Sequence, residues 1–518
     1  MELIRKNIHM NKEKCRSQMQ ITLDNDINVP DVKPDIEAII REQGSIKVNE
    51  ARAGNGRVSI RGELVVNILY TAGTDENKLQ HMVGTINFDE QINASDMCEG
   101  DNLQINCEID DLTADIINSR KISIKSIIRL SAAAEEIVDE EAAVTAIDEN
   151  HIEQLNDICQ VTELALSKKD IYRIKEEITI PAGRDSIREI LYQDIRLEEV
   201  DTRITEGQLS LRGDLKIFIL YSGVEGDRIN PYDTTVSFSG TIDCNGCKEG
   251  MIPNIGVSIQ DKDIQFKEDE DGEDRIVDIE LVLGLDMKVY REEEIELLTD
   301  MYSTACQIRP VYKDAGFDNI IIKNNGKTRV NERIMLDDKG SSILQMCNVA
   351  GTVRIDEEKI VPGGIMVEGI IEVKMLYFTD EDNSVIGAHK GMIPFSHFIE
   401  VKKIHENCVY DLDTNIEQIS ALVIDGREVE IKASVKIDVI VFEKINKRII
   451  VDCKVEENNL SKLMDIPGMT AYIVGKGDTL WSIAKEFSTT RDVIRQMNGI
   501  EAEDVKAGDK LLLVKQVG

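Results

Sequence analysis

Apolar and polar residues alternate over short stretches through most of the chain. Lys121–Arg129 and Glu428–Asp438 are two examples, each with a period of two residues. This period is typical of half-buried β-strands. Aromatic residues make up only 4% of the chain, so Ile, Val and Leu must fill the cores, and the β-branched members of this set favour strands. The pattern predicts a protein rich in antiparallel β-structure.

One segment recurs three times along the chain, with the same offsets of 151 and 156 residues between its glycines and between its tyrosines. A phenylalanine follows each glycine after 25 or 26 residues. The repeated residues are Gly62, Gly213 and Gly369, Tyr70, Tyr221 and Tyr377, and Phe88, Phe238 and Phe395. We interpret this as a triplication in which each repeat is an antiparallel β unit. The glycines lie inside strand patterns, where glycine marks a bulge or a close backbone approach.

Upstream of each glycine, a short stretch has helix-like apolar spacing behind a polar residue that can cap it. These stretches are Asp35–Ile40, Asp185–Leu191 and Ser341–Met346. The predicted fold class is therefore α+β and β-dominated, with three tandem antiparallel β-rich repeats that contain short helices, followed by a small βααβ domain.

Domain boundaries are expected where the repeat pattern fades and charge rises. Glu135–Glu141 and Arg291–Glu296 are such charged runs, which usually form solvated linkers or faces. The expected division is 1–150, 151–307 and 308–457 for the three repeats, 458–470 for a linker and 471–518 for the terminal domain.

The repeat resembles the SPOCS domain of sporulation coat proteins from spore-forming Firmicutes. The resemblance rests on Val29–Ile40 and on the strand that runs from Gly62 to Tyr70, and it spans most of residues 15–457. The second repeat keeps only Pro181 of the proline-rich loop, and the third has Leu336–Asp338 there. The role of this loop in the first repeat therefore need not extend to the other two.

The C-terminal segment from Ala471 predicts a strand, two capped helices and a closing strand. Asp478 or Thr479 can cap the first helix, and Thr489 or Thr490 the second. Two apolar stripes should face inward, one of Leu480, Ile483, Ala484 and Phe487, the other of Val493, Ile494 and Met497. Asn498 and Gly499 suit the left-handed end of the second helix.

This segment resembles the LysM family over its whole length. The resemblance implies a ligand groove between two loops, with Gly477, Asp478, Thr479 and Leu480 on one side and Asn498, Gly499 and Ile500 on the other. Trp481, the only tryptophan, is interpreted as a residue that packs on a partner. The structural alternative is that these residues only cap, turn or pack locally. The carboxylates of Glu501, Glu503 and Asp504 beside the groove favour a protein ligand over an N-acetylated glycan.

The formal net charge of −36 argues against nucleic acid and anionic membrane as partners, because a polyanion gains no counterion release on such a surface. The first nine residues lack the apolar run of a signal peptide, and no stretch of about eighteen apolar residues occurs. We therefore expect a cytoplasmic protein without direct membrane insertion. Ten dispersed cysteines suit reduced thiols in such a compartment.

No pattern in the sequence predicts catalytic residues, a metal site or a cofactor. Cys244 and Cys247 could be half of a zinc site or a redox pair, but no second pair follows at ligand spacing, so we interpret them as a chance thiol pair in a loop. The six histidines form no constellation that recurs in the repeats. A binding protein is predicted rather than an enzyme.

Three SPOCS-like repeats with a terminal LysM module imply a spore coat morphogenetic scaffold. The resemblance implies action in the mother-cell cytoplasm, assembly at the forespore surface and docking of the LysM groove on the coat-basement ATPase SpoIVA. The repeats would then serve self-association or further coat proteins. The alternatives are a protein that binds peptidoglycan or cortex glycan through the groove, and a wall hydrolase carried by LysM, for which no catalytic motif is found.

Overall fold

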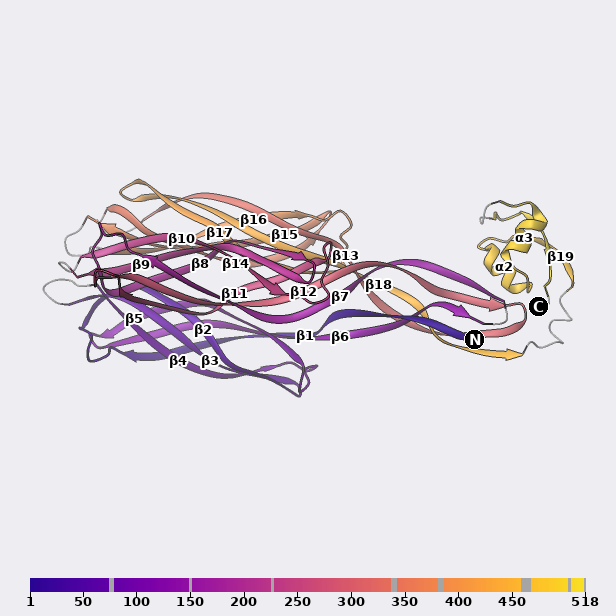
Figure 1. Ribbon diagram of the computed structural model, residues 1–518, viewed down its shortest axis with the longest axis horizontal. Coiled ribbons are helices and arrows are strands. Elements are labelled where there is room, and N and C mark those ends of the chain that lie inside the picture. Colours follow the sequence, from indigo (N-terminus) through magenta and orange to yellow (C-terminus); the bar gives the residue numbers. More distant parts are fainter. Residues whose placement is uncertain are drawn as a thin grey trace.

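The computed structural model describes residues 1–73, 79–148, 151–224, 228–336, 342–380, 386–457, 467–501 and 505–516. Within these ranges, strands fill almost all of the chain up to Glu457, and two short helices follow near the C-terminus. Figure 1 shows a broad β-rich body that narrows into long paired strands, with the helical module beyond them.

Each repeat unit contributes six described strands, which pair antiparallel in two three-stranded sheets. The first unit comprises β1 (Glu2–Asn28), β2 (Ile36–Gly54), β3 (Arg57–Ala72), β4 (Leu79–Asn93), β5 (Asn102–Asn118) and β6 (Lys121–Ile147). The second comprises β7 (Ile152–Thr179), β8 (Ile187–Thr205), β9 (Gln208–Gly223), β10 (Ile229–Asp243), β11 (Ile252–Glu268) and β12 (Asp274–Ser303). The third comprises β13 (Cys306–Met335), β14 (Ile343–Val361), β15 (Gly364–Thr379), β16 (Ile386–Glu400), β17 (Cys408–Asp425) and β18 (Glu428–Glu457).

The two sheets of a unit share one hydrophobic core. In the first unit, the sheet orders are β1-β6-β5 and β2-β3-β4, and the buried residues of β3 and β6 belong to the same cluster. Strand β3 buries every second residue from Val58 to Val66, with Gly62 in the middle of the series, as the alternation predicts. The equivalent clusters of the other two units are likewise built mainly from Ile, Leu and Val. The predicted β units are therefore confirmed.

The short helices predicted at the start of each unit are wrong, because these residues begin strands β2, β8 and β14. Each of these strands has two register shifts close together, in the first unit between Ile36 and Ala38 and between Ile39 and Arg41. The other units have the same shifts at equivalent positions. Two bulges three residues apart break the period of two and leave apolar spacing that imitates a helix.

The repeated glycines make room for the repeated phenylalanines. Gly62 pairs with Phe88 across β3 and β4, and a Cβ on Gly62 would lie 2.6 Å from Phe88 Cζ and 2.7 Å from the carbonyl oxygen of Lys47. The neighbouring strand has a register shift at this place, between Val48 and Glu50. Both expectations for these glycines, a bulge and a close approach, are met in the first unit.

The repeated tyrosines hold the loop at the start of each unit. Tyr70 Oη donates to the carbonyl oxygen of Pro34 at 3.2 Å, and Tyr221 Oη donates to that of Asp185 at 3.0 Å. An arginine supports the same loop from the end of the last hairpin. Arg120 donates to backbone oxygens of the first loop, and Arg275 does so in the second. Residues 337–341, which include most of the corresponding loop of the third unit, lie outside the described residues.

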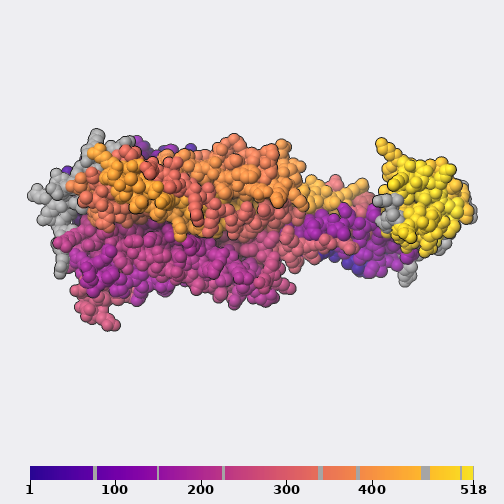
Figure 2. All heavy atoms as spheres, turned by 90° about the horizontal axis from the view of Figure 1, so that it is seen from above, coloured from indigo at the N-terminus to yellow at the C-terminus, as the bar shows by residue number. Residues whose placement is uncertain are grey.

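The three units pack around one axis. Leu69, Leu220 and Leu376 occupy equivalent positions and are buried in a single cluster that also takes in Phe218. Their cross-strand partners are Arg41, Tyr192 and Asn348, all three buried. Figure 2 shows the second and third units side by side along the body. The triplication therefore gives the body an approximate threefold arrangement.

Beyond the body, the outer halves of β1 with β6, β7 with β12 and β13 with β18 run together. We call this part, residues 2–13, 135–148, 151–164, 290–320 and 442–457, the stalk (Figure 1). Its core contains side chains from all three units: Ile8, Met10, Ala142, Cys159, Val161, Ile295, Leu297, Ala315, Phe317 and Ile449. The stalk thus ties the units together over a second region.

The charged runs expected to be linkers or solvated faces are strand segments of the stalk, and most of their charged side chains are exposed. Glu135 forms an ion pair with Lys288 of the second unit at 2.5 Å, and Glu140 forms one with Lys313 of the third at 2.8 Å. In the second run Ile295 belongs to the stalk core, whereas Ile137 of the first run is 63% exposed. Within a paired strand, some charged side chains of such a run can therefore form ion pairs with neighbouring units.

The chain passes from one unit to the next at the far end of the stalk. Strand β6 ends at Ile147 and β7 begins at Ile152, while β12 ends at Ser303 and β13 begins at Cys306. We call this end the tip. The N-terminus also lies there, next to the C-terminal module (Figure 1).

Candidate functional site

The C-terminal module contains β19 (Met469–Ile473), α2 (Leu480–Glu486), α3 (Arg491–Asn498) and β20 (Lys510–Val514) in that order. Strands β19 and β20 pair antiparallel. Met469 and Thr470, expected in the linker, belong to β19. Thr479 and Thr490 are the N-cap residues of the two helices, and their side chains accept hydrogen bonds from backbone N–H groups of the first turn. The local sequence signals thus fix both helix starts.

The apolar residues predicted to face the core are buried in the first helix but mostly not in the second. Leu480, Ile483 and Ala484 are buried, and Phe487 packs against the same cluster, as expected. In the second helix only Ile494 is buried. Met497 is 48% exposed, so its predicted inward position is wrong. A helix of eight residues in so small a module has only a narrow face on the core.

The first groove segment is held by its own hydrogen bonds. Gly477 has a φ of +97°, which glycine adopts readily. Asp478 Oδ2 accepts the hydroxyl of Tyr472 at 2.7 Å and the backbone N–H of Gly475 at 2.8 Å. These two hydrogen bonds lower the pKa of Asp478. Thr479 caps α2 in a reciprocal pair with Ser482, and Leu480 points into the core.

The second groove segment is likewise tied to the module. Asn498 Nδ2 donates to the carbonyl oxygens of Ile494 and Leu512, both at 2.8 Å, and its Oδ1 accepts the N–H of Leu512 at 2.7 Å. Gly499 closes α3 in the left-handed conformation with a φ of 63°. Ile500 packs against the cluster that buries Leu480, so both segments border one core.

Of the eight predicted contact residues, the polar side chains therefore all have structural partners. Asp478, Thr479 and Asn498 thus make the local contacts that the structural alternative expects, and their contact with a ligand stays a prediction. Gly477 and Gly499 remain exposed, and so do the flanking residues Lys476 and Glu501. A ligand of this groove would meet backbone and flanking charges rather than a set of free polar side chains. Glu503 and Asp504, which were expected to flank the groove, lie outside the described residues.

Trp481 faces another part of the same chain. Its side chain is buried, its ring makes an edge-to-face contact with Tyr302 at a centroid distance of 4.9 Å, and its Nε1–H donates to Asp300 Oδ2 at 2.8 Å. Lys485 Nζ also donates to both oxygens of Asp300, at 2.7 and 2.8 Å. In the structure the partner of Trp481 is thus β12 at the tip, and the sequence reasoning missed both Asp300 and Tyr302.

The charge state of Asp300 follows from this contact. Desolvation raises its pKa, but the hydrogen bonds from Lys485 and Trp481 together with the charge of Lys485 outweigh it, so the net pKa is lowered. The carboxylate therefore stays ionised at neutral pH and keeps its two donors.

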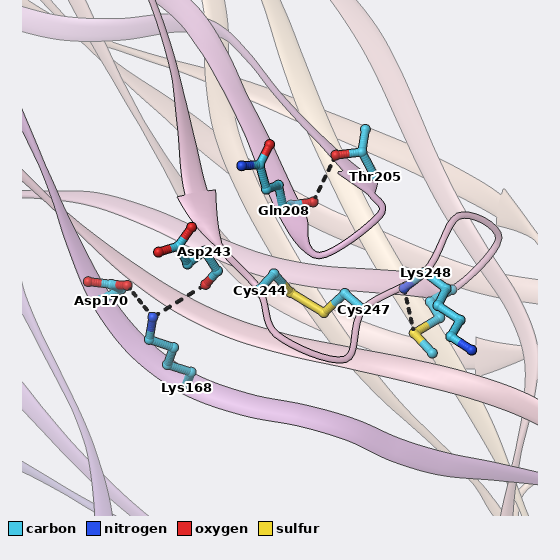
Figure 3. Close-up of a disulfide and its surroundings, with 9 residues drawn as sticks. Lys168, Asp170, Thr205, Gln208, Asp243, Cys244, Cys247 and Lys248 are labelled. Carbon is cyan, nitrogen blue, oxygen red and sulfur yellow. Dashed lines mark hydrogen bonds and ion pairs between the residues drawn. A yellow bond between two sulfur atoms is a disulfide. The ribbon is translucent and has the colours of Figure 1, made fainter.

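Cys244 and Cys247 form a disulfide in the second unit, so the prediction of a chance loop pair among reduced thiols is wrong (Figure 3). Both residues are buried in the core of that unit. In the first unit, the turn has Ala94 and Met97 at the equivalent positions, with the same backbone hydrogen bonds. The turn brings two buried side chains within reach of each other, at a Cα–Cα distance of 5.6 Å, which a disulfide can span.

Replacing Cys244 by Ala together with Cys247 by Met should preserve the fold, since the first unit has these residues in the same turn. The loss of the cross-link should lower the free energy of unfolding by about 2 kcal/mol, because the closed loop is short. Urea denaturation with and without a reductant measures this. The reductant should destabilise the wild type and leave the double variant unchanged. Equal stability of the wild type in both conditions would contradict the cross-link.

A cavity of about 890 Å³ lies between the three units. Polar groups that line it bond across units: Asn254 of the second unit donates to Asp411 of the third at 3.0 Å, and Lys436 of the third donates to the carbonyl oxygen of Val200 of the second at 3.3 Å. Asp413, opposite Asp438, has a raised pKa because of burial and of the neighbouring carboxylates. These pairings join different units, so we assign the cavity to their packing.

Among the described residues, no group of three or more His, Cys, Asp or Glu side chains is arranged to hold a metal ion. Nor does that part of the chain contain a helix long and apolar enough to cross a membrane.

Comparison with protein-family models gives four matches. Three are to the SipL, SPOCS domain, at residues 35–117, 186–267 and 342–424, and one is to the LysM domain, at residues 472–514. Neither the curated proteins nor the solved structures contain a match to the chain. The class of protein is thus a three-unit SPOCS protein with a terminal LysM module, and the chain is SipL-like.

The SPOCS matches cover only part of each unit. They run from β2 to β5, from β8 to β11 and from β14 to β17, and leave out the long first and last strands of the unit. Those strands complete one sheet of each core and build the stalk. The SPOCS and LysM families are non-catalytic binding or scaffold domains, and their combination fits a sporulation protein associated with the coat.

Proposed function

We propose that this protein is a non-enzymatic scaffold for spore coat assembly. It acts in the mother-cell cytoplasm, gathers at the forespore surface, and docks through its LysM groove on the coat-basement ATPase SpoIVA. The observation that carries the proposal is the combination of three SPOCS units, fused around one axis, with a LysM module at the tip. Such a body offers wide surfaces for other coat proteins or for self-association, while one end is left for a dedicated contact.

A protein ligand is favoured by the chemistry of the groove. Asp478, Thr479 and Asn498 already bond to the module itself, whereas exposed Lys476 and Glu501 carry charges of opposite sign beside the two segments. Charges at the rim of an interface mainly set specificity and association rate for a protein partner.

The test uses the full chain and the purified ATPase. Lys476→Glu combined with Glu501→Lys should reduce capture of the ATPase about tenfold, since it reverses both rim charges without touching a cap. Gln496→Lys, at an exposed position of α3, is the matched control and should bind as the wild type does. Undiminished capture by the charge-reversed variant would remove the groove from the interface.

The second candidate function is binding of peptidoglycan or cortex glycan, which the LysM match suggests. Here the exposed backbone at Gly477 and Gly499 would meet the sugar. Pelleting of the full chain with purified peptidoglycan, in the absence of any capture of the ATPase, would favour this function over the first.

A further inference from the structure

We propose that the tip of the second unit is a receptor for the LysM module of the same chain, and that Asp300 and Tyr302 select this tip among the three. This goes beyond the proposed function, because it concerns how the module is held whatever its external ligand is. The bound face of the module comprises Trp481, Lys485 and Arg491.

The contact has the features of a built interface. Tyr302 is buried, packs on the ring of Trp481, and donates its hydroxyl to the carbonyl oxygen of Thr489 at 2.8 Å. Asp300 accepts hydrogen bonds from Trp481 and Lys485, so one carboxylate satisfies the neutral indole N–H and also balances the charge of the ammonium group. Hydrogen bonds to a charged group count among the stronger ones in proteins. Aromatic packing and charge thus act at the same point.

A second strand of the tip completes the contact. Arg491 Nη2 donates to the carbonyl oxygen of Gln154 at 3.3 Å, and Arg491 Nε lies 3.9 Å from the carboxylate of Glu153. The Cζ atom of Arg491 lies over the Trp481 ring, 5.2 Å from its centroid. Leu155 of the same strand packs against the core of the module. The module therefore rests on both β7 and β12.

The other two tips lack the receptor residues. The last bulge of the stalk falls at Thr299 in the second unit and at the equivalent Val144 and Val451 in the others. The residue directly after the bulge is Thr145 in the first unit, Asp300 in the second and Asp452 in the third. The residue three positions after the bulge is Ile147, Tyr302 and Lys454, respectively. Ile147 is 55% exposed and Lys454 is exposed, whereas Tyr302 is covered by the module. Only the second unit combines a carboxylate with an aromatic ring.

The consequence is that the Trp481 face is closed in the described state. A partner of the module meets its other surfaces, in an orientation that the stalk fixes, unless the tip releases it. Fixing the module in this way removes the ordering cost that a free tether would add to each binding event.

The experiment exchanges the receptor residues for those of the first unit, Asp300→Thr with Tyr302→Ile, in the full chain. The stalk of the first unit has these residues at the same place, so the strand should still form. Trp481 is the only tryptophan, so its fluorescence reports the contact. The equilibrium ratio of docked to released module should fall about tenfold or more. Because Trp481 is then exposed to water, its emission should move to longer wavelength and acrylamide should quench it more strongly.

The matched control is Asp452→Thr with Lys454→Ile in the third unit, which should leave the emission of Trp481 as in the wild type. Lys485→Met, at an exposed position of the module, should weaken docking in the wild type and have no further effect once Asp300 and Tyr302 are exchanged. Equal quenching in the wild type and in the Asp300/Tyr302 variant would overturn the proposal. The proposal would also be overturned if Lys485→Met increased the quenching of Trp481 as much in the Asp300/Tyr302 variant as it does in the wild type.

Discussion

Replacing Phe317 by alanine should destabilise the stalk more than any other truncation of a single side chain there. Phe317 is fully buried in the stalk core, among Ile8, Val161, Leu297 and other residues of all three units. Truncation of a buried phenylalanine removes its transfer energy and leaves a cavity, which together cost about 4 kcal/mol. Urea denaturation measures the loss, and hydrogen exchange should show faster opening in the stalk strands of all three units.

Phe398→Ala is the control for this substitution, because Phe398 is 44% exposed. It should cost about 1 kcal/mol or less. Faster exchange confined to β13 in the Phe317 variant would mean that the stalk strands of the other units fold independently.

The repeated glycines should tolerate alanine in a definite order. A Cβ at Gly369 would lie 2.4 Å from the carbonyl oxygen of Arg354 and 3.1 Å from the Cα of Ile355, which are both backbone atoms. At Gly213 the nearest atom is Phe238 Cζ at 3.0 Å, and a ring can shift slightly. Gly369→Ala should therefore cost about 3 kcal/mol, Gly62→Ala somewhat less and Gly213→Ala least.

The free energy of unfolding of the three single variants measures this order. Gly256→Ala is the control, since its Cβ would meet only Asp286 Cβ at 3.8 Å and should change stability by about 0.5 kcal/mol or less. An equal loss in the free energy of unfolding at the three repeated positions would contradict this order. It would show that the strands relax around the added methyl group.

Several features of this fold are local and could be read from the sequence. Helix caps depend on one side chain and a backbone N–H two or three residues on, so the sequence narrowed each cap to two neighbouring residues, of which the structure uses Thr479 and Thr490. The left-handed end of α3 at Gly499 is equally local. The triplication was visible because equivalent strands need the same glycine and phenylalanine pair.

Two errors arose where local patterns were ambiguous. Paired bulges in β2 gave apolar residues a helical spacing, although the backbone is extended. The spacing of Cys244 and Cys247 suits several kinds of chemistry, and only the turn that buries both side chains distinguishes a disulfide from a free pair. Comparison with Ala94 and Met97 of the first unit is the sequence signal that could have identified the buried turn.

The sequence by itself determined the three β units and the LysM module, narrowed each helix cap to two neighbouring residues and gave the left-handed end of the second helix, because each depends on neighbours in the chain or on an internal repeat. Only the tertiary structure decided that the units share an axis and a stalk, and that Trp481 lies on Tyr302. These contacts join residues more than a hundred positions apart, and the periodicity of a strand shows that one face is buried but not which distant surface covers it.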